Sequence, residues 1–272
     1  MSPCGDLAVV IPARNESDRI GATVRAAARI GGADLIVVVD DGSSDGTAAE
    51  AAAAGAIVVR HSRNRGKGAA LETGAEAIRL IEAEREGAAA ERAPGGRTTS
   101  EGQDIRSGQS RHLLFLDADL GDTAAQAGPL ADPVRAGTAD MTIAVFAQRV
   151  KVGGHGIVLG LAGAGIERAT GWRPAEPLNG QRCLTRDAFE AVRPLAPRWG
   201  AETGMTIDLL RRGLRITEVT VPLAHRATGG DLGAQLHRAR QLLGVARALA
   251  ARQPWRHAAD GVAQVSEKAE TA

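Results

Sequence analysis

Four short polar clusters in this sequence combine residue types that bind phosphates, hydroxyl groups and divalent cations. They are Pro12–Glu16, Asp40–Ser43, Arg63–Gly68 and Asp117–Asp119, and each comes after a predicted strand. In an extended chain the carboxylates of Asp117 and Asp119 project on the same side. Two such carboxylates hold a hard divalent cation that keeps coordination positions free for phosphate oxygens. The spacing therefore predicts a metal–phosphate site.

The other clusters offer partners for the rest of a nucleotide. Lys67 lies between two glycines where a helix is expected to begin, so backbone N–H groups and one ammonium can meet an anion there. Asp40 or Asp41 can accept hydrogen bonds from a base N–H or a ribose hydroxyl. The alternative for Asp41 and Ser43 is a helix-capping turn. Together the clusters predict a pocket for a nucleotide diphosphate.

The clusters must be positioned by strands that end at one edge of a sheet. Continuous apolar runs alternate with segments of helical periodicity, which is typical of a mostly parallel sheet covered by helices on both faces. Ligands of such sheets bind beyond the carboxyl ends of the strands. We predict strands at 7–11, 35–39, 57–60, 113–116, 141–145 and 216–221, and helices at 17–29, 47–54, 68–84, 202–212 and 232–252.

This pattern describes a single α/β domain over residues 1–255. Residues 1–122 form its nucleotide-binding half and residues 123–255 its second half. A segment over about 86–110 has almost no large apolar side chains, which predicts a mobile insertion. Residues 256–272 read as a loose tail.

Composition excludes several classes of protein. The formal charge of the 272 residues is +1, so nucleic acid is not the expected partner. Cys4 and Cys183 form neither a disulfide framework nor a zinc cluster. No signal peptide or membrane span is predicted, and the Gly-rich apolar stretch 157–166 is too short to cross a bilayer. We therefore expect a cytoplasmic protein.

The predicted helix over 232–252 carries a basic side. One interpretation is a helix docked on the sheet with a solvated basic face. The other is a surface for anionic lipid or a phosphorylated acceptor, which would place the protein at the inner face of the membrane through peripheral contact.

The motifs VVIPARNES, VVVDDGSSDGT, RNRGKGAAL and FLDADL, in that order, resemble the family 2 glycosyltransferases with the GT-A fold. The second half resembles the polyprenyl-phosphate mannose and glucose synthases at Asn179–Arg182 and at Gly200–Thr203 with Asp208. His225-Arg226 is similar to the metal-binding histidine region of the glucosyl-phosphoglycerate synthases. Unlike the polyprenyl-phosphate enzymes with C-terminal spans, this sequence shows no span.

The resemblance implies a role for each matching residue on the donor side. Asp119 and Asp117 would hold Mg²⁺ or Mn²⁺, with His225 as a further ligand, and an imidazole ligand would favour Mn²⁺. Lys67 would face the diphosphate. The residues implied to bind the donor nucleotide are Pro12, Ala13, Asn15, Glu16, Asp41, Lys67, Asp117 and Ala118.

On the acceptor side, Glu202 is the candidate base for a hydroxyl acceptor and Asp208 is the second candidate. A phosphate acceptor is already ionised and needs cations, for which Arg182 and Arg226 are candidates, beside Gln181. Trp199 is either a core residue or a platform for the acceptor.

We therefore expect a metal-dependent glycosyltransferase that uses a UDP- or GDP-sugar and a phosphate- or hydroxyl-bearing acceptor, either a polyprenyl phosphate or a small phosphorylated metabolite. Two alternatives stay open. One is a nucleotidyltransferase, although such an enzyme wants a Gly-rich loop after the first strand and no glycine precedes Gly21 there. The other is a catalytically silent nucleotide- or partner-binding module.

Overall fold

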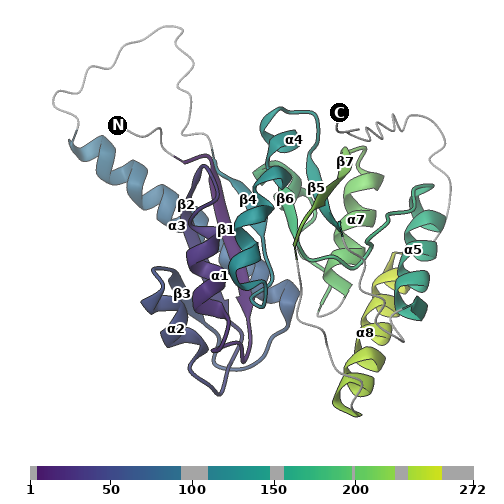
Figure 1. The fold of residues 1–272 in the computed structure, drawn as a ribbon. Helices are drawn as coiled ribbons and strands as arrows, with labels where there is room; N and C mark the ends of the chain where they lie inside the picture. Colours follow the sequence, from purple (N-terminus) through teal and green to yellow (C-terminus); the bar gives the residue numbers. More distant parts are fainter. Residues whose placement is uncertain (1–4, 93–109, 148–155, 198–199, 224–231, 253–272) are drawn as a thin grey trace, which may run out of the picture.

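The chain folds around one seven-stranded sheet in the order β3-β2-β1-β4-β6-β5-β7 (Figure 1). The computed structural model describes residues 5–92, 110–147, 156–197, 200–223 and 232–252. The strands are β1 (Leu7–Ala13), β2 (Ala33–Asp40), β3 (Ile57–Arg60), β4 (His112–Phe115), β5 (Met141–Phe146), β6 (Arg182–Leu184) and β7 (Ile216–Val221).

The sheet is parallel except at β6. The strand pairs β1–β2, β1–β4, β2–β3 and β5–β7 are parallel, whereas β6 runs antiparallel to both β4 and β5. The six predicted strands are confirmed with ends that differ by at most two residues. The three-residue strand β6 was not predicted because it is too short to show a periodicity.

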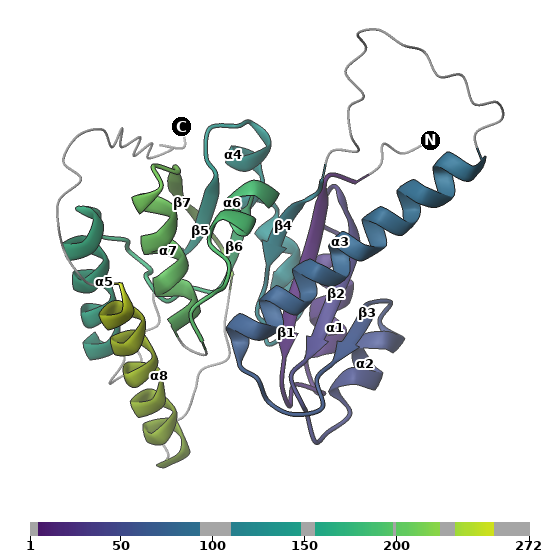
Figure 2. The ribbon, with the colours of Figure 1, turned by 180° about the vertical axis from the view of Figure 1, so that it is seen from behind.

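Helices cover both faces of the sheet, which makes three layers (Figures 1 and 2). Alternate β1 residues Leu7, Val9 and Ile11 pack on one face, and Ala8 and Val10 pack on the other. This alternation is the two-residue period of an extended strand. The elements on the first face are α1 (Ile20–Ala27), α2 (Thr47–Ala53), the 3₁₀ segment η1 (Gly121–Leu130) and α4 (Asp132–Arg135); those on the second are α3 (Lys67–Arg92), α6 (Arg186–Ala191) and α7 (Ala201–Arg211).

Two further helices, α5 (Gly156–Thr170) and α8 (Leu232–Ala251), lie side by side outside α7 (Figure 1). Val158, Ile166, Ile207, Val245 and Leu249 form the core between these three helices. The expectation that the last helix packs on the sheet is therefore corrected: α8 packs on α5 and α7. The apolar stretch 157–166 belongs to α5, and among the described helices none is long and apolar enough to span a membrane.

The start of the predicted insertion is also corrected. Helix α3 continues to Arg92, so residues 86–92 are helical and project beyond the sheet (Figure 2). Alanine and glutamate, both strong helix formers, supply most of this last part of α3, which explains a helix without large apolar side chains. Residues 93–109 and the predicted tail lie outside the described residues.

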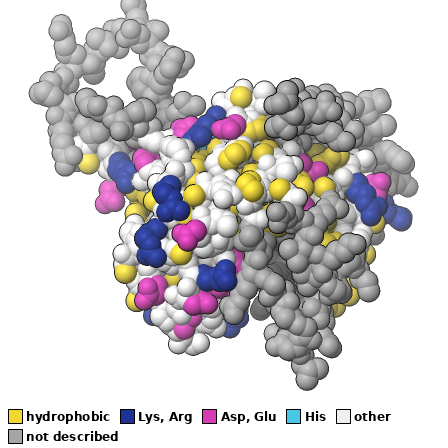
Figure 3. Space-filling model, in the orientation of Figure 1, with side chains coloured by type: hydrophobic (Ala, Val, Ile, Leu, Met, Phe, Trp, Pro, Cys, Tyr) yellow, Lys and Arg dark blue, Asp and Glu magenta, His cyan; other side chains and the backbone are white. Residues whose placement is uncertain are grey.

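Charged side chains of both signs are interspersed on the visible face of the molecule. In Figure 3, Lys and Arg alternate with Asp and Glu over the half that contains α1 and α2. This distribution agrees with the near-zero net charge of the sequence.

Candidate active site

The loops after β1 and β2 are joined by hydrogen bonds at the carboxyl edge of the sheet. Asn15 adopts a left-handed conformation with φ of 56°, which asparagine tolerates better than most residues. Its backbone N–H donates to Ser43 Oγ at 3.0 Å, and its side-chain Oδ1 accepts from the backbone N–H of Ser44 at 2.9 Å. The backbone N–H of Glu16 donates to Thr47 Oγ1 at 2.8 Å. Asn15 and Glu16 thus lie where the sequence predicts.

Pro12 and Ala13 are the last residues of β1, and Ala13 O accepts the backbone N–H of Asp41 at 2.9 Å. Both lie at the same edge as the loop residues. The structure therefore brings together the first part of the predicted nucleotide pocket.

Asp41 holds the next loop in place. Its carboxylate accepts the backbone N–H groups of Arg65 and Gly66, each at 2.7 Å, and contacts His61 Nδ1 at 2.7 Å. Burial raises the pKa of Asp41, but these hydrogen bonds outweigh burial and hold it below its ordinary value. Of the two roles that the sequence left open, the geometry supports a turn-forming carboxylate. His61, whose Nε2 contacts Thr73 Oγ1 of α3 at 3.0 Å, was not predicted.

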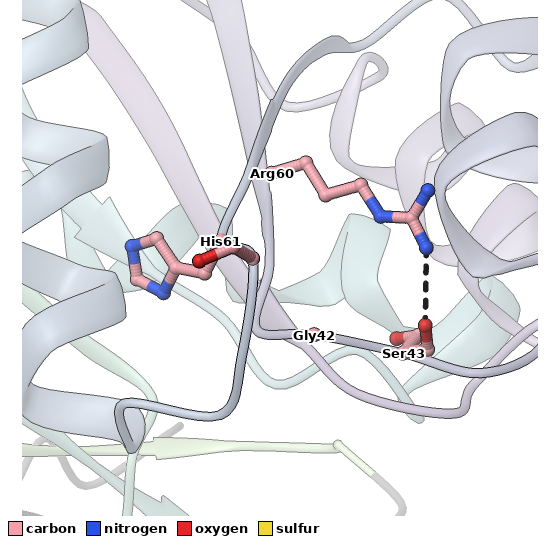
Figure 4. A pocket seen from close by; sticks show the side chains of 5 residues that line it. Gly42, Ser43, Arg60 and His61 are labelled. Atoms are coloured by element: carbon pink, nitrogen blue, oxygen red, sulfur yellow. Dashed lines mark hydrogen bonds between the residues drawn. The ribbon is translucent and has the colours of Figure 1, made fainter.

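A hollow of about 370 Å³ opens beside these loops and is lined by Gly42, Ser43, Arg60, His61 and Ser62. Figure 4 shows that the side chains of Arg60 and His61 point to opposite sides of it. The Arg60 guanidinium donates to Ser43 O at 3.1 Å and lies 3.0 Å from Asp40 Oδ2. Both side chains thereby stiffen the walls of this hollow.

The Asp117–Asp119 motif lies in a turn after β4. The strand ends at Phe115, so the extended-chain geometry expected for the two carboxylates is corrected. Helix α1 fixes the turn: Thr23 Oγ1 donates to Ala118 O at 2.7 Å, and Arg19 donates to Asp119 O at 3.2 Å. Ala118 is buried in the core, while Asp117 and Asp119 are partly exposed. The turn thus presents the carboxylates of Asp117 and Asp119, while Ala118 between them has no polar side chain.

Lys67 joins the two halves of the molecule. Its Nζ lies 2.6 Å from Asp117 Oδ1 and 2.9 Å from Glu202 Oε1, at the start of α7. Burial alone would lower the pKa of Lys67, yet the two carboxylates raise it well above its ordinary value. The ammonium is therefore charged, and in this structure it binds carboxylates at the place where the sequence predicted a diphosphate contact.

Residues 180 and 181 complete this cluster. Gln181 is fully buried, and its Nε2 donates to Asp117 Oδ2 at 2.7 Å. Gly180 packs so closely that a Cβ there would lie 2.2 Å from Lys67 Nζ. A side chain at this position would therefore require the Lys67 ammonium to shift. Gln181 thus lies beside Asp117, and its contact with an acceptor stays a prediction.

Arg182 does not face the open site. Its buried guanidinium donates to Asn179 O at 2.8 Å, Glu202 O at 3.0 Å and Thr206 Oγ1 at 2.9 Å. Burial lowers the pKa of Arg182 to about 10 despite the nearby Glu202 and Asp117, so it is protonated at neutral pH. Arg182 was expected to contact an acceptor phosphate. In the structure its guanidinium instead holds the start of α7.

Asp208 is separated from this cluster as well. It lies towards the end of α7, where its carboxylate pairs with Arg252 next to the end of α8. Asp208, the second candidate for the base, therefore makes a contact between α7 and the end of α8 instead of facing the cluster around Lys67. Trp199, His225 and Arg226 lie outside the described residues.

Comparison with known proteins shows which family and which solved structures the chain resembles. Residues 8–79 match the sequence profile of Glycosyl transferase family 2. No curated protein matches the sequence significantly. Among solved structures, glucosyl-3-phosphoglycerate synthase from Mycobacterium tuberculosis, in complex with Mg²⁺ and uridine-diphosphate, is 24% identical with a TM-score of 0.67. The alignment covers 90% of this chain and 78% of that one.

Two more structures share the fold. The same synthase in complex with Mn²⁺, UDP-glucose and phosphoglyceric acid is 26% identical, with a TM-score of 0.64 and coverage of 90% of this chain and 79% of that chain. A mycobacterial protein is 27% identical, with a TM-score of 0.65 and coverage of 90% and 74%. The profile match over residues 8–79 shows similarity to Glycosyl transferase family 2, and the structural matches show that the chain shares the GT-A fold.

Proposed function

We propose that the protein transfers a sugar from a UDP-sugar to a small phosphorylated acceptor in a metal-dependent reaction. The observation that carries this proposal is the Lys67 bridge, which brings Asp117 of the nucleotide half and Glu202 of the second half to one ammonium. A transferase needs donor and acceptor groups at one point, because positioning the two reactants supplies much of the rate enhancement.

The relatives favour particular ligands. The M. tuberculosis synthase has been crystallised with Mg²⁺ or Mn²⁺, with UDP or UDP-glucose, and with phosphoglyceric acid or glycerol 3-phosphate. These complexes support UDP over GDP, and a small phosphorylated acceptor over a polyprenyl phosphate. The experiments below also include GDP-sugars as donors and a lipid phosphate as acceptor, so that either alternative would be detected.

The proposed metal site rests on the two carboxylates that follow β4. Across the described parts of the chain, no three His, Cys, Asp or Glu side chains gather into a metal-binding group. Asp117 and Asp119 are the proposed metal ligands, since Mg²⁺ is commonly held by one or two carboxylates together with substrate phosphates. When bound, the metal would neutralise charge on the leaving diphosphate. His225 stays a proposed further ligand.

Glu202 is the proposed base. In the transfer, the bond between the anomeric carbon and the diphosphate oxygen breaks, and the acceptor oxygen forms the new bond to that carbon. The proton of an acceptor hydroxyl passes to the Glu202 carboxylate, and the nucleoside diphosphate leaves as an anion. Arg226 stays a proposed partner for the acceptor phosphate. The Arg182 guanidinium already donates hydrogen bonds to Asn179 O and Glu202 O.

A thermal-shift panel of UDP- and GDP-sugars, each with and without Mn²⁺, tests the donor. A ligand at 100 times its Kd adds about 2.7 kcal/mol, which raises the melting temperature by roughly 2–4 °C in a domain of this size. We expect a Mn²⁺-dependent shift with a UDP-sugar that Asp119→Ala abolishes. If none of the donors shifts the melting temperature of folded protein, the proposal is refuted and a silent module is favoured.

Two carboxylates of α7 give a matched pair for the transfer step. Glu202→Gln removes the proposed base and should lower kcat about 10²–10⁴-fold with a hydroxyl acceptor. Asp208→Asn changes the same charge on the same helix, but its partner is Arg252, so kcat should stay near the wild-type value. Equal losses in both variants would remove Glu202 from the mechanism.

The acceptor is tested by product analysis with 3-phosphoglycerate and with a short polyprenyl phosphate in vesicles. We expect a glycosylated product with the small acceptor. Transfer to the lipid alone would overturn this part of the proposal while leaving the donor part intact.

A further inference from the structure

Lys67 lies in a closed cradle. Two of its sides are the carboxylates of Asp117 and Glu202, and Gly180 closes another, since a Cβ there would lie 2.2 Å from Nζ and 2.9 Å from Asp117 Oδ1. The Lys67 side chain is 19% exposed, and that of Glu202 is 7% exposed. The ammonium is thus shared between two halves of the molecule in a tightly packed place.

The same Asp117 oxygen that binds Lys67 is one that a metal would use. Asp117 Oδ1 lies 2.6 Å from Nζ, and Oδ2 accepts from Gln181 at 2.7 Å. A divalent cation bound to this oxygen would lie close to the ammonium, and the repulsion between the two positive charges would weaken both interactions. Metal coordination through Oδ1 would therefore compete with the Lys67–Asp117 pair.

We propose that Lys67 is a resident counter-cation: without donor it binds Asp117 and Glu202, and on donor loading Asp117 exchanges it for the divalent metal. This inference rests on the proposed function and deepens it. Lys67 would keep its pair with Glu202, and the incoming diphosphate would give the released ammonium a new anionic partner. It is a positioning residue that keeps the two halves of the site assembled before the donor arrives.

The exchange couples metal binding to nucleotide binding. Without nucleotide, the metal must displace Lys67 and leave its ammonium with one carboxylate fewer. With nucleotide, the diphosphate compensates the ammonium, so each ligand should strengthen the binding of the other by the same factor. Removal of the Lys67 charge should therefore tighten the binding of metal alone and remove the part of this coupling that Lys67 contributes.

Mn²⁺ binding to the full chain, measured by calorimetry with and without UDP, tests the exchange. We expect Lys67→Met to bind Mn²⁺ alone about tenfold more tightly than wild type, with a UDP–Mn²⁺ coupling factor smaller than that of wild type. Arg60→Met is the matched control: it removes the same charge from the same sheet edge, but its partner is Asp40. The control should leave Mn²⁺ affinity unchanged.

Mn²⁺ affinity that is unchanged or weaker in folded Lys67→Met, while wild type binds UDP and Mn²⁺, would overturn the exchange and leave the proposed function intact. Wild-type protein that binds neither ligand would overturn both. If Arg60→Met also binds Mn²⁺ more tightly, the effect comes from net charge alone, and the proposed exchange is overturned.

A measurement on wild-type protein avoids any folding defect of Lys67→Met. The sequence has three lysines, Lys67, Lys151 and Lys268, so the ammonium NMR spectrum of ¹⁵N-lysine protein is simple to assign with Lys67→Arg. Addition of UDP and diamagnetic Mg²⁺ should move the Lys67 signal, and UDP alone should move it less. A Lys67 signal that does not move at saturating UDP and Mg²⁺ would overturn the proposal.

Discussion

The two halves of this sheet edge are assembled in different ways. In the nucleotide half, neighbouring parallel strands end together, and their loops bond side chain to backbone, as Asn15 does with Ser44 and Asp41 with Gly66. In the second half, the site depends on a buried guanidinium, Arg182, which ties the loop before antiparallel β6 to the start of α7. The first arrangement repeats along the chain, whereas the second is formed once from distant segments.

The largest effect should come from the second half. Arg182→Met leaves the carbonyls of Asn179 and Glu202 without their charged donor, and we expect a loss of about 3–5 kcal/mol in unfolding free energy. Denaturant unfolding measures it. Arg79→Met, at an exposed pair with Glu76, is the control and should cost less than about 1 kcal/mol. A similar, small loss in both variants would show that Arg182 is not the anchor described here.

The corresponding change in the nucleotide half is Asp41→Ala. It removes the acceptor of two backbone N–H groups and of His61, so we expect a loss of about 2–3 kcal/mol in the same experiment. Asp41→Asn keeps one acceptor oxygen and should lose less. If Asp41→Ala unfolds at the wild-type denaturant concentration, the loop is held by other contacts.

Two glycines sharpen the comparison at the level of packing. A Cβ on Gly74 of α3 would lie 2.4 Å from Val10 Cγ1 in β1, and one on Gly165 of α5 would lie 2.5 Å from Leu249 Cδ1. Valine is stiff at χ1 whereas leucine can rotate away, so Gly74→Ala should cost about 1–3 kcal/mol. Gly165→Ala should be near neutral, since it also gains about 1 kcal/mol of helix propensity. Thermal unfolding that ranks them in the opposite order would contradict this explanation.

The smallest effect concerns an exposed carboxylate between the first two loops. Hydrogen bonds from Thr47 and Ser17 lower the pKa of Asp45 to about 2. A lowered pKa means that Asp45 stabilises the fold above its ordinary value of 3.8 and that this contribution disappears as the pH falls through about 2. An NMR titration of the carboxyl carbon measures it, and Thr47→Val should raise the pKa towards 3.8. An ordinary pKa in the wild-type protein would contradict the loop geometry.

The sequence predicted most of the nucleotide half. Runs such as Leu7–Ile11 and Leu35–Val39 are long enough to identify buried strands, and the polar clusters that follow them are contiguous in the chain. The topology of parallel strands then brings Asn15, Asp41 and Asp117 to one edge without any knowledge of side-chain contacts. The motifs that resemble family 2 glycosyltransferases pointed to the same residues.

Side-chain roles in the second half depended on contacts that no local pattern encodes. The sequence could not show that Arg182 is buried, that Asp208 pairs with Arg252, or that Thr23 holds the turn of Asp117–Asp119. The contacts of Asp208 and Thr23 join residues that are 44 and 95 positions apart in the chain. The burial of Arg182 is a property of the assembled core.

Sequence alone therefore determined the fold class, the order of the strands along the chain and the edge at which the site lies, because hydrophobic periodicity is local. Only the tertiary structure decided which charges meet. Lys67 shows the reason: whether an ammonium binds a diphosphate or two carboxylates depends on which anions the fold brings within 3 Å of it, here Asp117 and Glu202. Such neighbours follow from packing between distant segments, and residue type by itself does not specify them.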